Sequence, residues 1–295
     1  MGQRPAIDSR RYIVAFALRS IDDCPSDFEL TASLAGFDAG IFLPRDSPDW
    51  FGRSSYPPRI LLLIGGAIYI VSHPSAGESP CQCALEQISS VESGHMLLKG
   101  WLRFTGPDFD YTVRYNTRGF PPVSRFMRRF RSKLLCGAAP RGTAEVHFGV
   151  GLDIKFSNAL TTELDPGETV FVRAFQAPRT VRFRSWLFPR RHSMAGDLLA
   201  LTGRRLLWIT DRERESYSAY GAIASYAPCD AVLRIGLTSG PAGGILQVGL
   251  NTGSAWQVPI AAESGLDCQR LAQDFAAALE AQKRRNEASR TEVRR

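Results

Sequence analysis

An arginine-rich segment spanning residues 179–192 carries the side chains best suited to ligand recognition in this chain. A guanidinium group can donate paired hydrogen bonds to a phosphate or carboxylate, and neighbouring aromatic side chains can enter a membrane interface. Arg182 and Arg184 alternate, so they share one face of a strand. The alternative is that the aromatic side chains pack inside the protein while the arginines are solvated. The expected ligand-binding residues are Arg179, Arg182, Arg184, Trp186, Phe188, Arg190 and Arg191.

A second basic surface is expected on a helix near residue 130. Apolar residues recur there at helical spacing, and arginines surround them. The apolar stripe is Val123, Phe126, Met127, Phe130 and Leu134, and the basic face is Arg125, Arg128 and Arg129. Such a face can meet an acidic partner, although solvation is the commoner role. Nucleic acid is not expected as the partner, because no zinc finger or RNP-type aromatic pair is legible.

The sequence predicts no metal, cofactor or catalytic site. Cys81 and Cys83 lie two apart and would share one face of a strand, where His73 or His95 could join them. However, the paired spacing of a structural zinc site is missing, so buried thiols are the preferred interpretation. No phosphate-binding loop, nucleophile elbow or HExxH helix is present. An enzyme with an active site assembled from distant residues remains an alternative.

The composition indicates a folded protein, and its positive charge favours anionic partners only weakly, because part of the excess lies in the tail 282–295. The chain has 295 residues, 44% of them hydrophobic and 22% charged, and a formal net charge of +7. Its longest apolar run, residues 60–71, is too short to cross a bilayer, so no transmembrane segment is expected. The N-terminus lacks an apolar signal region, and the six cysteines lack the spacing of a secreted framework. These features predict a cytoplasmic protein, with peripheral attachment to the inner membrane surface as an extension of that prediction.

The chain is expected to contain one structural unit twice. Each copy has an apolar strand pair, further short strands and a closing amphipathic helix, and the second helix carries Cys268, Leu271, Ala272, Phe275 and Leu279. Residues 64–72 align with residues 202–210 in apolar pattern, around a shared glycine. A second match aligns Val113, Tyr115, Asn116 and Thr117 with Val248, Leu250, Asn251 and Thr252.

Seven short strands followed by one helix resemble the pleckstrin-homology-like (PH-like) superfamily. The segment 203–211 is similar to a strand motif of its bacterial PH and GRAM-like members. Residues 165–168, which a strand follows, are similar to the segment with which those domains begin. The resemblance covers most of residues 165–282 and, less well, 57–135. It implies a mainly β (α+β) fold of two partly open seven-stranded barrels, each closed by a C-terminal amphipathic helix. In phosphoinositide-binding PH domains the loop between the first two strands grips the headgroup, and the arginine-rich segment occupies that place.

These observations predict a non-catalytic binding or adaptor protein that recognises an anionic lipid surface or a partner protein. The alternative is a structural scaffold that binds peptides at a strand edge or a helix groove. The expected divisions are an N-terminal extension (1–56), a first PH-like domain (57–136), a connector with a short helix (137–164), a second PH-like domain (165–282) and a basic disordered tail (283–295).

Overall fold

The computed structural model of the chain shows a mainly β fold that divides into two compact units. Unit 1 comprises residues 1–88, 95–103 and 109–134, and unit 2 comprises residues 89–94, 104–108 and 135–295. The structure describes residues 14–28, 34, 36–45, 56–96, 99–135, 146–149, 151–183, 190–211, 221–240, 243–261 and 267–293.

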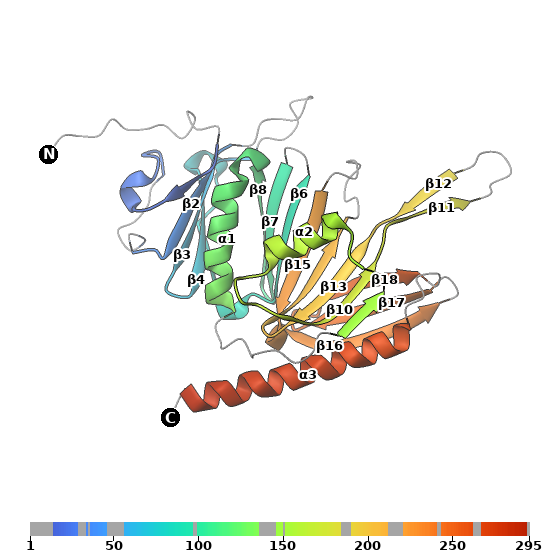
Figure 1. Cartoon of the computed structure of the whole chain (residues 1–295). Helices are drawn as coiled ribbons and strands as arrows, with labels where there is room; N and C mark the ends of the chain where they lie inside the picture. The colour runs from blue at the N-terminus through green and yellow to red at the C-terminus, as the bar shows by residue number, and fades with distance from the viewer. Residues whose placement is uncertain are drawn as a thin grey trace. The chain divides into compact units, whose positions relative to one another are not determined.

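Unit 1 contains an antiparallel sheet whose strands are neighbours in chain order (Figure 1). Its central hairpin turns at Gly65 and Gly66, whose φ values of 51° and 87° favour glycine. The hairpin strands are almost fully buried, which explains their unbroken apolar sequence. The strands are β1 (Phe16–Leu18), β2 (Ala39–Leu43), β3 (Arg59–Ile64), β4 (Ala67–Ser72) and β5 (Cys81–Ala84).

The segment 1–56, predicted as an extension packed on the first domain, contributes strands to this sheet. Ile41 of β2 pairs with Leu61 of β3, and β1 pairs with β2 on the other side. A domain boundary at residue 57 would therefore separate two strands that are hydrogen-bonded to each other. The apolar run in β2 is too short to show either the alternation of a strand or the spacing of a helix. Pairing with β3 makes it a strand of the sheet.

Three further strands lead to helix α1 (Phe120–Leu134): β6 (Ser90–Met96), β7 (Lys99–Gly106) and β8 (Phe109–Asn116). The sequence of β6 does not mark it as a strand. Its glycine, serine and glutamate have low strand propensity, yet Val91 is fully buried and fixes one face of the strand. The α1 stripe is buried as predicted at Val123, Phe126, Met127 and Phe130, and α1 packs against β1 and β2.

Unit 2 begins with the connector and a second sheet. The predicted helix is α2 (Ile154–Glu163), whose N-terminus is capped by Asp153, which accepts a 2.9 Å hydrogen bond from the Phe156 N–H. The connector also contains an unpredicted strand, β9, which pairs in parallel with β10. Five consecutive strands of this eight-stranded sheet lie in unit 2, in the order β15 (Gly221–Pro228), β14 (Arg205–Thr210), β13 (Asp197–Thr202), β10 (Val170–Gln176) and β9 (Val146–Gly149).

A three-stranded antiparallel sheet and helix α3 (Cys268–Val293) complete unit 2. The strands are β16 (Val232–Gly240), β17 (Gly243–Leu250) and β18 (Ala255–Ala261), and α3 runs along β16 (Figure 1). Apolar residues from both sheets and from α3 form one core, which includes Leu199, Trp208, Val248 and Phe275. The predicted α3 stripe is buried at Leu271, Ala272, Phe275 and Leu279.

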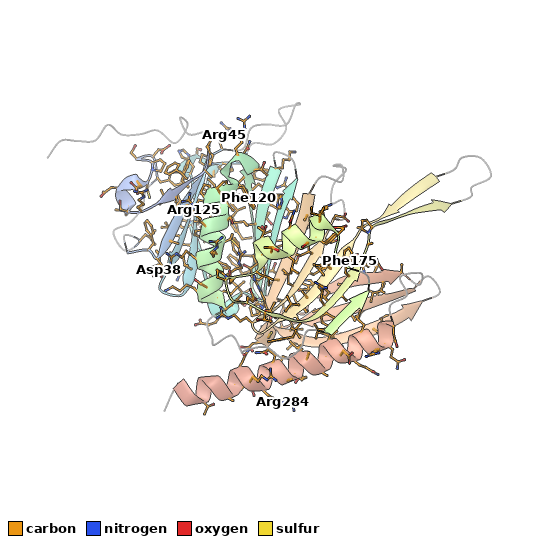
Figure 2. All side chains as sticks on the ribbon, in the orientation of Figure 1. Asp38, Arg45, Phe120, Arg125, Phe175 and Arg284 are labelled. Carbon is orange, nitrogen blue, oxygen red and sulfur yellow. The ribbon has the colours of Figure 1, made fainter. Side chains whose placement is uncertain are left out.

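The predicted disordered tail at 283–295 is instead helical through Val293. Lysine, arginine, glutamate and alanine are good helix formers, and they extend a helix that is already nucleated by its packed half. Buried Gln282 donates a 2.9 Å hydrogen bond from Nε2 to Asn286 Oδ1. The following turn is exposed at Arg284, which points away from the sheet (Figure 2). The prediction of disorder from composition alone was therefore wrong for this segment.

Two stretches of the chain share one succession of elements. Four antiparallel strands (β2 to β5 in the first stretch; β10, β13, β14 and β15 in the second), a 3₁₀ turn, three strands (β6 to β8; β16 to β18) and an α-helix follow one another, apart from the strands inserted at 179–183 and 190–194. The 3₁₀ turns are η5 (Leu85–Gln87) and η7 (Cys229–Ala231), and the residue after each has φ −82° and ψ 113°. The N–H of Leu85 donates to Gly66 O at 2.8 Å, and that of Cys229 donates to Arg204 O at 3.0 Å. Both turns are thus anchored to the preceding hairpin in the same way.

The second sequence match, of residues 113–117 with residues 248–252, does not join corresponding strands. Val113 and Tyr115 lie in β8, the last strand before α1, whereas Val248 and Leu250 lie in β17, the second-last strand before α3. In the described part of the chain the strands form open sheets, and no closed barrel is present.

Candidate functional site

The arginine-rich segment forms a β-hairpin inserted between two strands of unit 2. Its strands are β11 (Arg179–Phe183) and β12 (Arg190–Met194), which pair in antiparallel fashion. The flanking strands β10 and β13 pair directly with each other, up to Gln176 and Asp197. The hairpin therefore occupies the connection between two sheet neighbours, as the sequence predicted, and extends beyond their ends (Figure 1).

Four of the seven predicted ligand-binding residues come together on the two hairpin strands. Arg182 is the register partner of Arg191, Arg190 is the partner of Phe183, and Arg179 lies at the last rung. The two strands together contain these four arginines and no aspartate or glutamate. Positions directly opposite in an antiparallel pair have Cβ atoms about 5 Å apart, where like charges destabilise the pair. The other three predicted residues, Arg184, Trp186 and Phe188, lie outside the described residues.

The predicted basic face of α1 is exposed. Arg125, Arg128 and Arg129 all lie on the solvent side of the helix, opposite its buried apolar stripe; Figure 2 marks Arg125. Their i, i+3 and i, i+4 spacing places the charges side by side. By contrast, Arg131 is 4% exposed and belongs to the packed side of the helix.

A buried ion pair in unit 2 was not foreseen from the sequence. Arg205 Nη2 lies 2.6 Å from Glu168 Oε2, and both side chains are almost completely buried. Thr202 Oγ1 donates to Glu168 Oε1 at 2.7 Å, and Arg205 Nη2 also donates to the Glu163 carbonyl at 2.6 Å. Burial pushes the pKa of Glu168 upward, but the charge and hydrogen bonds of Arg205 outweigh it and lower that pKa below its usual value. This closed network joins β13 and β14 to the entry of β10.

A second polar cluster, also unforeseen, lies in unit 1 and is partly open to solvent. Three donors converge on Glu78 Oε2: Ser72 Oγ at 2.5 Å, Tyr111 OH at 3.0 Å and Arg59 Nη2 at 3.2 Å. Burial opposes ionisation of Glu78 only partly; the hydrogen bond from Ser72, with those from Tyr111 and Arg59, lowers its pKa. The cluster joins residues up to 52 positions apart in sequence, so no local motif marks it.

Unit 2 has a small cavity between its two sheets. Apolar side chains line most of it, among them Leu199, Leu246 and Ile260, and its volume of about 20 Å³ has room for a single water molecule. The polar residues at its wall already have partners. Gln176 Oε1 accepts a 2.7 Å hydrogen bond from the Ala261 N–H, and Asp197 Oδ1 accepts one of 2.9 Å from Trp208 Nε1. This cavity cannot hold an organic substrate.

The cysteines and histidines that were considered as metal ligands have other surroundings in the described part of the chain. Cys81 and Cys83 lie on β5, where burial raises the pKa of Cys83 to about 11 and so favours the thiol over the thiolate that binds metals. His73 Nε2 lies 3.0 Å from Asp27 Oδ2, and His95 packs against the ring of Phe120. Among the described residues, no group of three or more His, Cys, Asp or Glu side chains could hold a metal ion.

Within the ranges that the structure describes, no helix combines the length and the apolar character needed to span a membrane.

With the hairpin, the basic helix face and the two polar clusters as its functional candidates, the chain was compared with known proteins: no protein-family model matches it, and no curated protein does.

Proposed function

We propose that this chain is a non-catalytic binding protein of two tandem PH-like units, and that the β11–β12 hairpin attaches it to an anionic membrane surface on the cytoplasmic side. The observation that carries the proposal is the hairpin itself, with four arginines and no acidic residue on two paired strands. An anionic ligand would relieve the repulsion between register partners Arg182 and Arg191.

The repeated succession of elements supports the two-unit interpretation. Four strands, a 3₁₀ turn, three strands and a helix agree with the seven-stranded PH-like arrangement, and this succession occurs twice along the chain, ending at α1 and at α3. The hydrogen bonds that hold η5 and η7 correspond although the residues differ. Gly66 accepts one of them and Arg204 the other, each through its backbone carbonyl oxygen.

The energetics favour a membrane surface that carries negative charge. Each arginine close to an anionic leaflet contributes about 1 kcal/mol, so four contribute on the order of 4 kcal/mol when all approach it. The aromatic residues of the connecting segment, Trp186 and Phe188, would add burial in the interface. The net charge of +7 assists the approach at long range and loses this effect in high salt.

Co-sedimentation with vesicles of graded phosphatidylserine content tests the proposal. We expect binding to rise with anionic lipid and to fall with salt. Changing Arg179, Arg182, Arg190 and Arg191 together to glutamine should remove most of it. The matched control changes Arg125, Arg128 and Arg129 on α1 to glutamine, which removes exposed charge from another surface. The hairpin assignment fails if the control loses binding and the hairpin variant keeps it.

A second candidate function is peptide binding at a sheet edge. β18 is an end strand of the three-stranded sheet, and Ala255 and Gln257 on it are exposed. An extended peptide can add to such an edge through main-chain hydrogen bonds. That binding would tolerate high salt, so salt dependence separates the two candidates.

A further inference from the structure

The cluster around Glu78 consists of a rigid set of donors and a separately supplied acceptor. Arg59 is the first residue of β3 and Ser72 is the last residue of β4, and the two are register partners. Arg59 Nε donates to Ser72 Oγ at 3.2 Å, and its guanidinium lies 5.3 Å from the centre of the Tyr111 ring. The Arg59 side chain is 7% exposed. These contacts hold the three donors in place without help from Glu78.

Glu78 itself comes from an irregular segment between the 3₁₀ turn η4 (Pro74–Ala76) and β5. Gly77 precedes it with φ of 66°, a conformation that favours glycine, and Ser79 and Pro80 follow. The Glu78 side chain remains 42% exposed. The acceptor can therefore leave the cluster by rearranging a surface segment, whereas the donors lie on sheet strands.

We propose that Arg59, Ser72 and Tyr111 form a carboxylate-binding site, that Glu78 occupies it from within the same chain, and that a carboxylate of a partner polypeptide displaces Glu78. This cluster lies in unit 1, whereas the β11–β12 hairpin belongs to unit 2. Intramolecular occupancy makes the site selective for partners present at high local concentration.

The charge of the donors selects the class of ligand. One guanidinium and two neutral hydroxyl groups supply a single positive charge, which balances a carboxylate and leaves a phosphate dianion half compensated. Arg59 Nη1 is buried and makes no hydrogen bond within the described residues, so the guanidinium has donor capacity to spare. A polypeptide carboxylate, from an acidic side chain or a chain end, fits this donor set.

The first experiment empties the site and refills it with a small anion. Glu78→Ala should lower the thermal unfolding temperature, and sodium acetate should restore it more than sodium chloride or phosphate at the same ionic strength. Adding Ser72→Ala and Tyr111→Phe should abolish the acetate effect. Asp110→Ala is the matched control, because it removes a carboxylate from the exposed pair with Arg103, whose Nε lies 2.7 Å from Asp110 Oδ1. Equal effects of acetate and chloride on Glu78→Ala would overturn the proposal.

The second experiment asks whether the intact chain exchanges its own carboxylate. A tethered group competes at an effective concentration of about millimolar or above, so a capped glutamate is titrated from millimolar upward. Hydrogen exchange of the amides of Ala76 and Gly77, which donate to His73 O at 2.8 Å and to Pro74 O at 3.1 Å in the turn before Glu78, should accelerate as the probe displaces the segment. The probe should act on the intact chain at concentrations at least tenfold higher than on Glu78→Ala.

The two experiments must agree for the proposal to stand. Rescue of Glu78→Ala by acetate without any release of the segment in the intact chain would make the cluster a purely structural ion pair and would overturn the proposal. If Glu78→Ala does not fold, Glu78→Gln keeps the shape while removing the charge, and the same comparison of acetate with chloride applies. Vesicle binding is not a readout here, so failure of the hairpin proposal leaves this test unaffected.

Discussion

Arg59 in unit 1 and Asp197 in unit 2 occupy the same place in two similar hairpins with opposite charge. Each is the first residue of its strand and the register partner of a hydroxyl residue at the end of the next strand, Ser72 and Thr210 respectively. Arg59 donates to a carboxylate, whereas Asp197 accepts from the Trp208 indole N–H. The two units therefore cannot present the same ligand chemistry at this position.

The buried pair of Arg205 and Glu168 should be the most sensitive polar interaction in unit 2. Glu168→Ala leaves a buried guanidinium without its partner, and we expect a loss of about 3–5 kcal/mol in the free energy of unfolding. Asp110→Ala, which breaks an exposed pair, should cost less than about 1 kcal/mol. Urea unfolding of both variants measures the difference. Equal small losses would contradict the burial described for this pair.

The same carboxylate should make unit 2 sensitive to acid. The pKa of Glu168 is lower in the folded protein than in the unfolded chain, so its contribution is complete above the unfolded pKa of about 4.3. It is lost as the pH falls through the lowered folded pKa. Unfolding monitored between pH 7 and pH 2 should show a decline that Glu168→Gln makes shallower. A parallel decline in both proteins would assign the acid sensitivity to other groups.

Arg191→Glu should separate hairpin stability from ligand binding. The change places opposite charges at the rung shared with Arg182, which favours the strand pair by about 0.2–1 kcal/mol. Amide hydrogen exchange in residues 179–183 should therefore slow, while binding to anionic vesicles weakens. A variant that binds vesicles as strongly as the original chain would argue against a role of the arginine charge.

Gly100 should tolerate no side chain. A Cβ atom there would lie 2.4 Å from the ring of Tyr115, which is fully buried and has no room to move. Gly100→Ala should cost about 1–3 kcal/mol through overpacking, as measured by denaturant unfolding. Gly151→Ala is the control, since a Cβ atom there would meet nothing within 4 Å. Similar stability of the two variants would contradict the close approach of β7 and β8.

Helix α3 should be essential to the core of unit 2 over its first half only. Phe275 is fully buried between the sheets, and Phe275→Ala should cost about 3–5 kcal/mol. Arg284→Ala, in the exposed turn, should change the free energy of unfolding by less than about 0.5 kcal/mol. Calorimetry on both variants tests this asymmetry. A large effect of Arg284→Ala would mean that the second half of the helix also carries stability.

The sequence predicts those parts of the fold that depend on neighbouring residues. The turn at Gly65 and Gly66 and the stripes of α1 and α3 follow from local conformational preference and from helical spacing. Strand β6 and the sheet membership of β2 depend on partners far along the chain, which no local period reveals. The candidate sites divide in the same way. The arginines of the hairpin are adjacent in sequence and were predicted, whereas Arg59, Glu78 and Tyr111 are brought together only by the sheet.

The direct pairing of β10 with β13 means that the hairpin proposed to bind the membrane and the paired strands of the core are encoded in different stretches of unit 2. The last rung, Gln176 with Asp197, closes the sheet before the hairpin begins. Residues 178–195 could thus be replaced by a short turn, or by another loop of the same reach, without disturbing the core. If the hairpin is the binding element, as we propose, a different insertion at this point would change the ligand and leave the rungs between β10 and β13 in place.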